Sequence, residues 1–195
     1  MFIELTDILR CPQPHAEQFL VLIPDQMVAR SVIVGRLGCP VCQREYPIVD
    51  GMADFGGDTP AGDLVSPAVS GEVLATFLGL SGPGGYVAMV GGNAGLGATL
   101  IAALPGVHLV GVNLAPDSRE LPMLSVVRAP GIPIKSRNLR GVILLEPVAS
   151  EPKWLREAGR VTLPGLRVVG QGDLPVESTL EVLASAGGWW VAQKT

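Results

Sequence analysis

Three cysteines and one histidine near the start of the chain have the types and spacing of metal ligands. Cys11 and His15 form a C-x3-H pair, and Cys39 and Cys42 form a C-x2-C pair after a spacer of 23 residues. Structural zinc takes four thiolate or imidazole ligands in a tetrahedron, commonly supplied as two close pairs. Proline or glycine flanks each pair, which suits a tight turn that aims two side chains at one point. The pattern therefore predicts a zinc site made by these four side chains.

The C-x2-C pair has a second interpretation as a redox dithiol, in which Cys11 and His15 have no part. Redox pairs of this kind usually lie at the start of a helix that follows a strand. The residues after Cys42, QREYPIVDG, are instead typical of a strand and a turn, so we favour zinc. Residues 1–55 also offer too little apolar core to fold well alone, and a bound metal would supply stability.

The sequence around these ligands resembles a known family. TDILRCP at the start and GCPVCQREYPIVDGMADF after the spacer are similar to the small zinc-ribbon proteins that partner and activate methyltransferases. The resemblance covers residues 1–55 and is most specific through YPIVDG. It implies a zinc ribbon, which in that family is a separate subunit or is fused ahead of a methyltransferase. His15 departs from the family, which more often has cysteine there or has lost the metal.

A glycine-rich turn in the second half is the other candidate site. YVAMVGGNAGLGATLIAAL, followed by VHLVGVNL, predicts a strand, a glycine turn, a helix and a second strand. Glycines let the backbone approach a ligand closely, and a helix N-terminus offers free N–H groups. The candidate cofactor-binding residues of this turn are Gly91, Gly92, Asn93 and Gly95.

The second half, residues 71–195, resembles the class I S-adenosylmethionine-dependent methyltransferases. EPKWLREAGRVTLPGLRVVG is similar to their helix, turn and following strand, and VVRAPGIPIKSRNLRGVILLE to the passage before it. The glycine spacing also resembles the short-chain dehydrogenases, but those enzymes need a Tyr-x3-Lys pair. Neither Tyr46 nor Tyr86 has a lysine four residues later, so we favour the methyltransferase resemblance. It implies S-adenosylmethionine as the cofactor.

Several positions depart from the methyltransferase pattern where that family binds its cofactor. Met89 and Asn93 stand where the family has an acid and a glycine. Asn113 stands where an acid usually binds the ribose, so the resemblance makes it a further candidate cofactor-binding residue. Pro130 stands where an acid lies near the adenine. Because a hydrogen bond to a charged group contributes about 1.5–3 kcal/mol, losing several weakens binding greatly. We expect weak or absent cofactor binding, with Asp117 as the acid that could replace the ribose ligand.

The elements that position these residues follow from the hydropathy pattern. Residues 1–55 contain β-like stretches, and residues 56–70 are rich in Gly, Pro, Asp and Ser, as in a linker. Residues 71–195 alternate strands and helices, which predicts a truncated Rossmann-like α/β domain with a mostly parallel sheet. The expected strands are 86–92, 107–114, 125–129, 141–146, 166–170 and 189–193, and the expected helices are 71–81, 98–104, 153–160 and 178–187.

Composition excludes several classes of protein. The chain has 195 residues, 48% of them apolar and 16% charged, and a net charge of −4. This balance excludes a disordered chain and argues against a dedicated nucleic-acid binder, which carries a basic surplus. Three cysteines, an odd number, argue against a disulfide scaffold. Neither a bilayer-spanning apolar run nor a signal peptide is evident, so we expect a cytoplasmic protein without membrane contact.

Other polar side chains have less specific roles. We expect His108 to be structural, and Asp117 and Glu120 to be solvated loop acids. The resemblance to the zinc-ribbon activators implies a translation component as a partner, because the methyltransferases of that family often act on such components. A local basic cluster is either a solvated face or a contact for phosphate or RNA. Its members are Arg128, Lys135, Arg137 and Arg140.

The low charged fraction indicates a buried protein surface, in a homo-oligomer or against a different protein. Trp189 and Trp190 alternate across a strand, so we expect one in the core and the other at an interface. The sequence thus predicts a zinc ribbon joined to a methyltransferase-like domain that has lost its cofactor site and acts through protein association. Two alternatives stay open: an active methyltransferase with an atypical cofactor site, and a module that binds another nucleotide.

Overall fold

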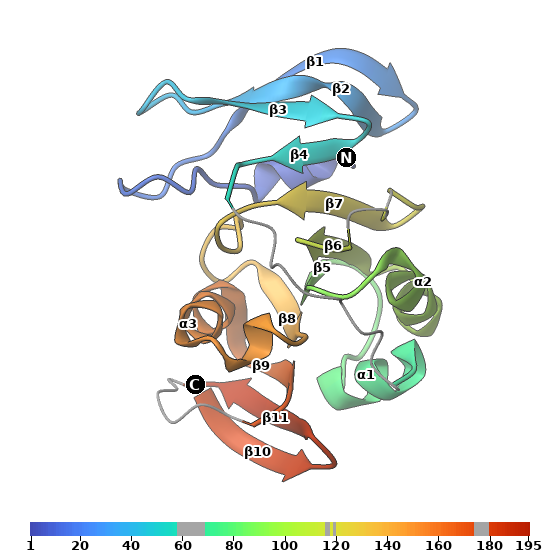
Figure 1. Ribbon diagram of the computed structural model, residues 1–195. Helices are drawn as coiled ribbons and strands as arrows, with labels where there is room; N and C mark the ends of the chain where they lie inside the picture. The colour runs from blue at the N-terminus through green and yellow to red at the C-terminus, as the bar shows by residue number, and fades with distance from the viewer. Residues whose placement is uncertain (58–68, 116–117, 119, 174–179) are drawn as a thin grey trace.

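One sheet runs through the whole molecule. The computed structural model describes residues 1–57, 69–115, 118, 120–173 and 180–195. Eleven strands are hydrogen-bonded in the order β1-β2-β3-β4-β7-β6-β5-β8-β9-β11-β10 (Figure 1). The pairs from β4 to β9 in this order are parallel, and the pairs at both ends are antiparallel. The mostly parallel sheet predicted for residues 71–195 holds for the pairs from β7 to β9 in this order, whereas β11 and β10 extend the sheet with antiparallel pairs.

The N-terminal unit, residues 1–55, is an antiparallel meander behind a short helix. Its apolar side chains Val32, Leu37 and Ile48 are buried on one face of the strands. The first 3-10 helix packs its Leu5 into the same cluster. The elements are η1 (Ile3–Asp7), β1 (Val21–Val28), β2 (Ser31–Gly38), β3 (Glu45–Val49) and β4 (Met52–Asp54).

The predicted alternation of strands and helices is confirmed over most of the second half. Five strands in this part pair in parallel, as buried apolar runs of this length favour. Among the described residues, no helix is both long and apolar enough to cross a membrane. The elements are α1 (Gly71–Leu78), β5 (Tyr86–Val90), α2 (Ala94–Ala103), β6 (His108–Val112), β7 (Leu124–Arg128), β8 (Leu139–Leu144), η2 (Val148–Ser150), α3 (Pro152–Val161) and β9 (Thr162–Gln171).

The helix predicted over residues 178–187 is wrong. Residues 178 and 179 lie outside the described part, and Leu180–Ala186 form strand β10, antiparallel to β11 (Trp189–Lys194). Gly187 and Gly188 both have positive φ, 61° and 75°, which matches the two-residue turn of a tight hairpin. Pairing with β11 therefore outweighs the helix-like spacing of the apolar residues.

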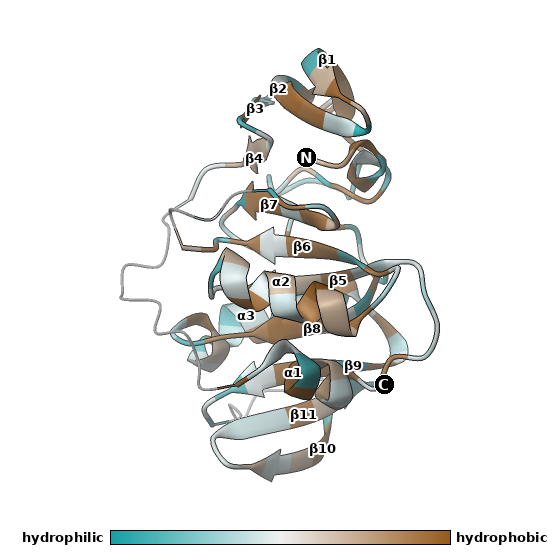
Figure 2. Ribbon diagram, turned by 90° about the vertical axis from the view of Figure 1, so that its right-hand side faces the viewer, coloured by the Kyte–Doolittle hydropathy of each residue, from teal (hydrophilic) through white to brown (hydrophobic). Residues whose placement is uncertain are grey.

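Helices cover both faces of the parallel strands. Figures 1 and 2 show α1 and α2 on one face and α3 on the other. Two separate buried clusters match these two faces. The strand order reverses direction between β5 and β8, and ligands of open α/β sheets bind beyond the carboxyl ends of the strands at such a point.

The two adjacent tryptophans lie on opposite faces of β11. Trp190 is fully buried, and its ring approaches Gly170 so closely that no larger residue fits there. Trp189 is half-buried, and its ring lies 6.3 Å from that of Phe77 in α1. The prediction of one core tryptophan is confirmed, whereas the second packs against a helix of the same chain.

Glu120 differs from its predicted role as a solvated acid. Its carboxylate lies 2.7 Å from the amine of Met1 and accepts a hydrogen bond from Ser31 Oγ at 2.9 Å. Because Met1 is fully buried, this carboxylate compensates a charge that would otherwise be costly to bury. Asp117 and linker residues 58–68 lie outside the described part of the chain.

His108 joins the N-terminal unit to β6. Its ring stacks on Phe2 with 4.7 Å between centroids and meets the edge of Tyr86 at 5.6 Å. Its Nε2 lies 3.0 Å from Ser125 Oγ. Burial lowers the pKa of His108 to about 4, and the nearby N-terminal amine acts in the same direction. The predicted structural role of this histidine is confirmed.

We expect the free energy of unfolding to fall as the pH falls from about 6.5 toward 4. The unfolded chain protonates His108 near pH 6.5, whereas the folded chain does so only near pH 4. Stability from this residue is therefore fully present above pH 6.5, and about 2 kcal/mol of it is lost by pH 5. Urea unfolding at pH 7.5 and 5 measures this loss, which should shrink in His108→Gln. An equal loss in both proteins would contradict the assignment.

Candidate functional site

The four predicted metal ligands meet at one point. Their ligand atoms all lie within 4.8 Å of one another. The Sγ atoms of Cys11 and Cys42 are 3.7 Å apart, and Cys39 Sγ lies 3.4 Å from His15 Nε2. Zinc bonds of about 2.3 Å to sulfur and 2.0–2.1 Å to nitrogen separate tetrahedral ligand atoms by about 3.5–3.8 Å. The four residues therefore fit a zinc ion, and no disulfide joins the cysteines, which are all free.

Backbone hydrogen bonds shape both halves of the ligand set. In the turn between β2 and β3, Cys39 N–H donates to the Arg44 carbonyl at 2.9 Å, and Gln43 N–H donates to the Cys39 carbonyl at 3.0 Å. In the first half, His15 Nδ1 lies 2.7 Å from the Ala16 carbonyl. A proton on Nδ1 would bond that carbonyl and leave Nε2 as the metal ligand.

Glu17 fastens the loop with Cys11 and His15 to the second half of the chain. Its carboxylate accepts hydrogen bonds from Ser136 N–H at 3.0 Å and from Ser136 Oγ at 2.9 Å. It also faces Arg160 of α3 at 3.6 Å. Burial alone would raise the pKa of Glu17, but the hydrogen bonds from Ser136 and Arg10 outweigh it and hold the pKa below its usual value. No local sequence pattern predicts this contact of Glu17, because its partners lie far away along the chain.

The thiols of the cluster are held in different environments. A hydrogen bond from the Arg44 backbone N–H lowers the pKa of Cys42 to about 7, and His15 also favours its thiolate. Burial raises the pKa of Cys11, although the Tyr46 hydroxyl 3.1 Å away opposes this. Burial also raises the pKa of Tyr46, so its hydroxyl stays protonated. A zinc ion would displace the thiol protons, since it binds thiolates.

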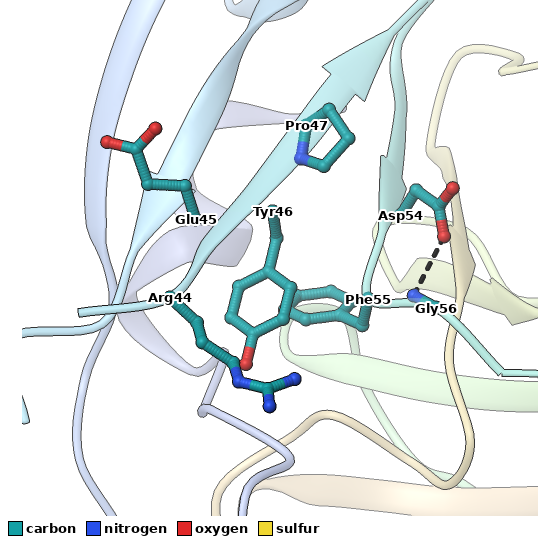
Figure 3. Close-up of a pocket in the computed structure, with 7 residues that line it drawn as sticks. All are labelled: Arg44, Glu45, Tyr46, Pro47, Asp54, Phe55 and Gly56. Carbon is teal, nitrogen blue, oxygen red and sulfur yellow. Dashed lines mark hydrogen bonds between the residues drawn. The ribbon is translucent and has the colours of Figure 1, made fainter. Parts of the chain in front are cut away.

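A cavity of about 480 Å³ opens beside the ring of Tyr46 (Figure 3). Phe55 packs against that ring with 4.9 Å between centroids, and Arg44 lies at the same cavity. Asp54 also lines it, but its carboxylate already pairs with Arg128 and accepts from Gly56 N–H. No local sequence pattern predicts this cavity, because its lining comes from two separate segments, residues 44–47 and 54–56.

The glycine turn has the predicted strand–turn–helix geometry. Gly91 and Gly92 follow β5 with φ of 79° and 77°, which glycine adopts without strain. Asn93 caps α2, where its Oδ1 accepts a hydrogen bond from Leu96 N–H at 2.9 Å. Gly95 is exposed in the first turn of the helix. The structure thus places these four candidate residues beside one another at the switch point between β5 and β8.

Other parts of the chain already contact this turn. Ala115 N–H donates to the Gly92 carbonyl at 2.8 Å, and Ala94 N–H donates to Ser118 Oγ at 3.1 Å. The buried side chain of Leu145 lies over Gly92, so that a methyl group on Gly92 would come within 2.6 Å of Leu145 Cδ1. The two cavities described lie elsewhere, and the second, of about 430 Å³, is lined by Leu80, Gly82, Pro83, Ala103, Leu104, Pro105 and Val107.

Asn113 faces the neighbouring strand. It is buried, and its Oδ1 accepts from Ala129 N–H at 2.9 Å while its Nδ2 donates to the Ala129 carbonyl at 2.8 Å. Both ends of the amide therefore bind one residue, which ties the end of β6 to the end of β7. Cofactor binding by Asn113 stays a prediction. The same holds for Gly91, Gly92, Asn93 and Gly95.

The predicted basic cluster does not form one patch. Arg128 ends β7 and pairs with Asp54, whereas Arg140 begins β8 at the opposite edge of the parallel strands. Arg140 donates to the carbonyls of residues 81–84. Lys135 Nζ donates to a main-chain carbonyl at 2.8 Å. Arg128, Lys135 and Arg140 therefore each have a partner within the chain. Arg128 and Arg140 are also apart, because one lies at the end of its strand and the other near the start of its strand.

The chain was compared with known protein families, curated proteins and solved structures. No protein-family model and no curated protein matches the chain. It is similar to a solved Streptomyces coelicolor geranyl diphosphate C-methyltransferase with bound S-adenosyl-L-homocysteine (18% identity, 58% of this chain and 52% of that one, TM-score 0.45). A complex of the Haloferax volcanii Trm112 methyltransferase activator and a putative methyltransferase is also similar (16% identity, 51% of this chain and 50% of that one, TM-score 0.42).

A third similar structure is phosphoethanolamine N-methyltransferase 2 of Haemonchus contortus with bound S-adenosyl-L-methionine (16% identity, 59% of this chain and 32% of that one, TM-score 0.45). The chain spans about half the length of these solved proteins, or less. The similar structures are thus methyltransferases or their complexes.

We expect protein purified without chelator to contain about one zinc ion per chain, because the four ligand atoms fit a tetrahedral site. Cys39→Ser and His15→Ala should each retain far less zinc after dialysis against a competing chelator. His108→Gln changes the other histidine of the chain, which lies outside the cluster, and should keep zinc. Plasma emission spectrometry measures the metal. Zinc-free wild-type protein, or full zinc in both ligand variants, would contradict the site.

Proposed function

We propose that this protein is a zinc-stabilised, methyltransferase-like scaffold that does not use S-adenosylmethionine and acts through protein association. Residues 1–55 form the zinc ribbon, residues 56–70 the linker, and residues 71–195 the methyltransferase-like domain. The observation that carries the proposal is the pair of hydrogen bonds between the Asn113 amide and the backbone of Ala129.

The polar atoms of Asn113 are not free to bind a ribose. A ribose bound beyond β6 needs an acceptor aimed into the crevice, and a carboxylate is the strong form of that acceptor. The Asn113 side chain carries no charge, and both of its polar atoms have partners within the chain. Ser118 and Leu145 add to the case, because they contact the helix start and the glycine turn where a cofactor would approach.

Exposed aliphatic side chains of the N-terminal unit support protein association. Val21 and Val28 of β1 and Val49 of β3 are 45%, 59% and 54% exposed. β1 is also an edge strand, and such strands readily pair with other chains. We propose a second copy of this chain as the partner and the cytoplasm as the location. An RNA or translation-component contact has weaker support, because Arg128 and Arg140 are engaged within the chain.

We expect no calorimetric heat when S-adenosylmethionine or S-adenosylhomocysteine is titrated to about 1 mM. Two lost charged hydrogen bonds, at about 1.5–3 kcal/mol each, weaken binding at least about 100-fold. Asn113→Asp should not restore binding, and it should lower stability, because a carboxylate would face the Ala129 carbonyl without a proton to donate. Micromolar binding by the wild type would favour an active methyltransferase or another nucleotide-binding module instead.

We expect light scattering to give a mass above the 20.3 kDa of one chain at tens of micromolar protein. Val21→Asp should restore the monomer, because a charge at an apolar interface is costly to desolvate. Val182→Asp is the matched control, since Val182 is 46% exposed on β10 at the opposite edge of the sheet. A monomeric wild type at every concentration would contradict self-association.

A further inference from the structure

Tyr46 reaches the metal ligands although it is not one of them. Its Oη lies 3.1 Å from Cys11 Sγ, within hydrogen-bond distance for sulfur. Both side chains are buried, with 5% of Tyr46 and 2% of Cys11 exposed. Bulk water is therefore a poor substitute partner for the Cys11 sulfur.

The position of the Tyr46 hydroxyl is set by packing on both sides of β3. Tyr46 is the register partner of Leu37 in β2, which fixes its backbone. Its ring contacts Phe55, whose N–H donates to the Arg128 carbonyl of β7 at 2.7 Å. Tyr46 therefore contacts Cys11 through its hydroxyl and Phe55, next to the junction with β7, through its ring. Figure 3 shows the rings of Tyr46 and Phe55 beside each other.

We propose that Tyr46 is a positioning residue for the metal, whose O–H donates a hydrogen bond to the Cys11 thiolate and holds that sulfur in ligating geometry. This inference rests on the zinc site proposed above. A metal-bound thiolate has no proton, so the phenol must be the donor. A hydrogen bond to a charged acceptor is about twice as strong as a neutral one.

The hydroxyl has two consequences for the metal. It orients one of the four ligands before the ion binds, which reduces the ordering that binding requires. It also draws charge from the sulfur, which slows attack on the thiolate by protons and electrophiles. Removal of partners that hydrogen-bond to metal ligands commonly weakens metal binding about 10–100-fold.

The chain offers a matched control for this role. Tyr46→Phe removes only the hydroxyl and keeps the ring against Phe55. Tyr86 is the other tyrosine of the chain, half-buried against His108, so Tyr86→Phe removes the same group away from the cluster. Circular dichroism and urea unfolding of both zinc-loaded variants test whether each is folded.

The experiment measures zinc affinity by chelator competition and records the sulfur-to-cobalt charge-transfer band of Co²⁺-loaded protein. We expect Tyr46→Phe to lose about 10–100-fold in zinc affinity and to shift that band, while Tyr86→Phe matches the wild type. The band reports charge on the thiolates, which a loss of packing alone does not move.

Two results would overturn the inference, and they differ. Wild-type affinity and an unshifted band in Tyr46→Phe would show that the hydroxyl does not act on Cys11, while the zinc site would stand. A wild-type protein that binds neither Zn²⁺ nor Co²⁺ would remove the site and the role of Tyr46 together.

Discussion

A short parallel pairing between β4 and β7 holds the two halves of this protein in one sheet. Ala53 pairs with Val127 and Asp54 with Arg128, and the Asp54 carboxylate also pairs with the Arg128 guanidinium. Phe55 N–H extends the contact to the Arg128 carbonyl. Because of this pairing, the buried face of the N-terminal unit continues into the cluster beneath α3.

The candidate metal site lies within the N-terminal unit, and the loop that supplies two of its residues also contacts the second half of the chain. Cys39 and Cys42 come from the turn between β2 and β3, whereas Cys11 and His15 come from a loop that Glu17 ties to Ser136 and Arg160. A metal ion bound by all four would connect that loop to the meander. Metal binding and the docking of the N-terminal unit on α3 would then support each other, as folding and metal binding do in small zinc proteins.

The glycine turn has the backbone conformation of a nucleotide-binding turn, but the side chains around it contact other parts of the chain. Gly91 and Gly92 keep the conformations that bring a strand into a helix. The groups around them, however, are directed toward other parts of the chain: Asn113 toward Ala129, and Leu145 toward Gly92. A fold whose strand order suits a nucleotide can therefore serve other purposes, because function depends on the side chains at the crevice.

The sequence by itself determined which four side chains are candidate metal ligands, the strand–turn–helix at Gly91, and most strands and helices between residues 71 and 171. These features depend on neighbours within a few residues, through turn formation and hydrophobic periodicity. Only the tertiary structure decided that residues 180–186 form a strand, because pairing with β11 outweighs local preference.

The tertiary structure also decided which partner each buried polar group has. Glu120 meets Met1, Tyr46 meets Cys11, and Asn113 meets Ala129. Each partner lies at least 16 residues away, where no local pattern specifies which way a side chain points. The direction is set by the register of the strands and by the need to pair every buried polar group.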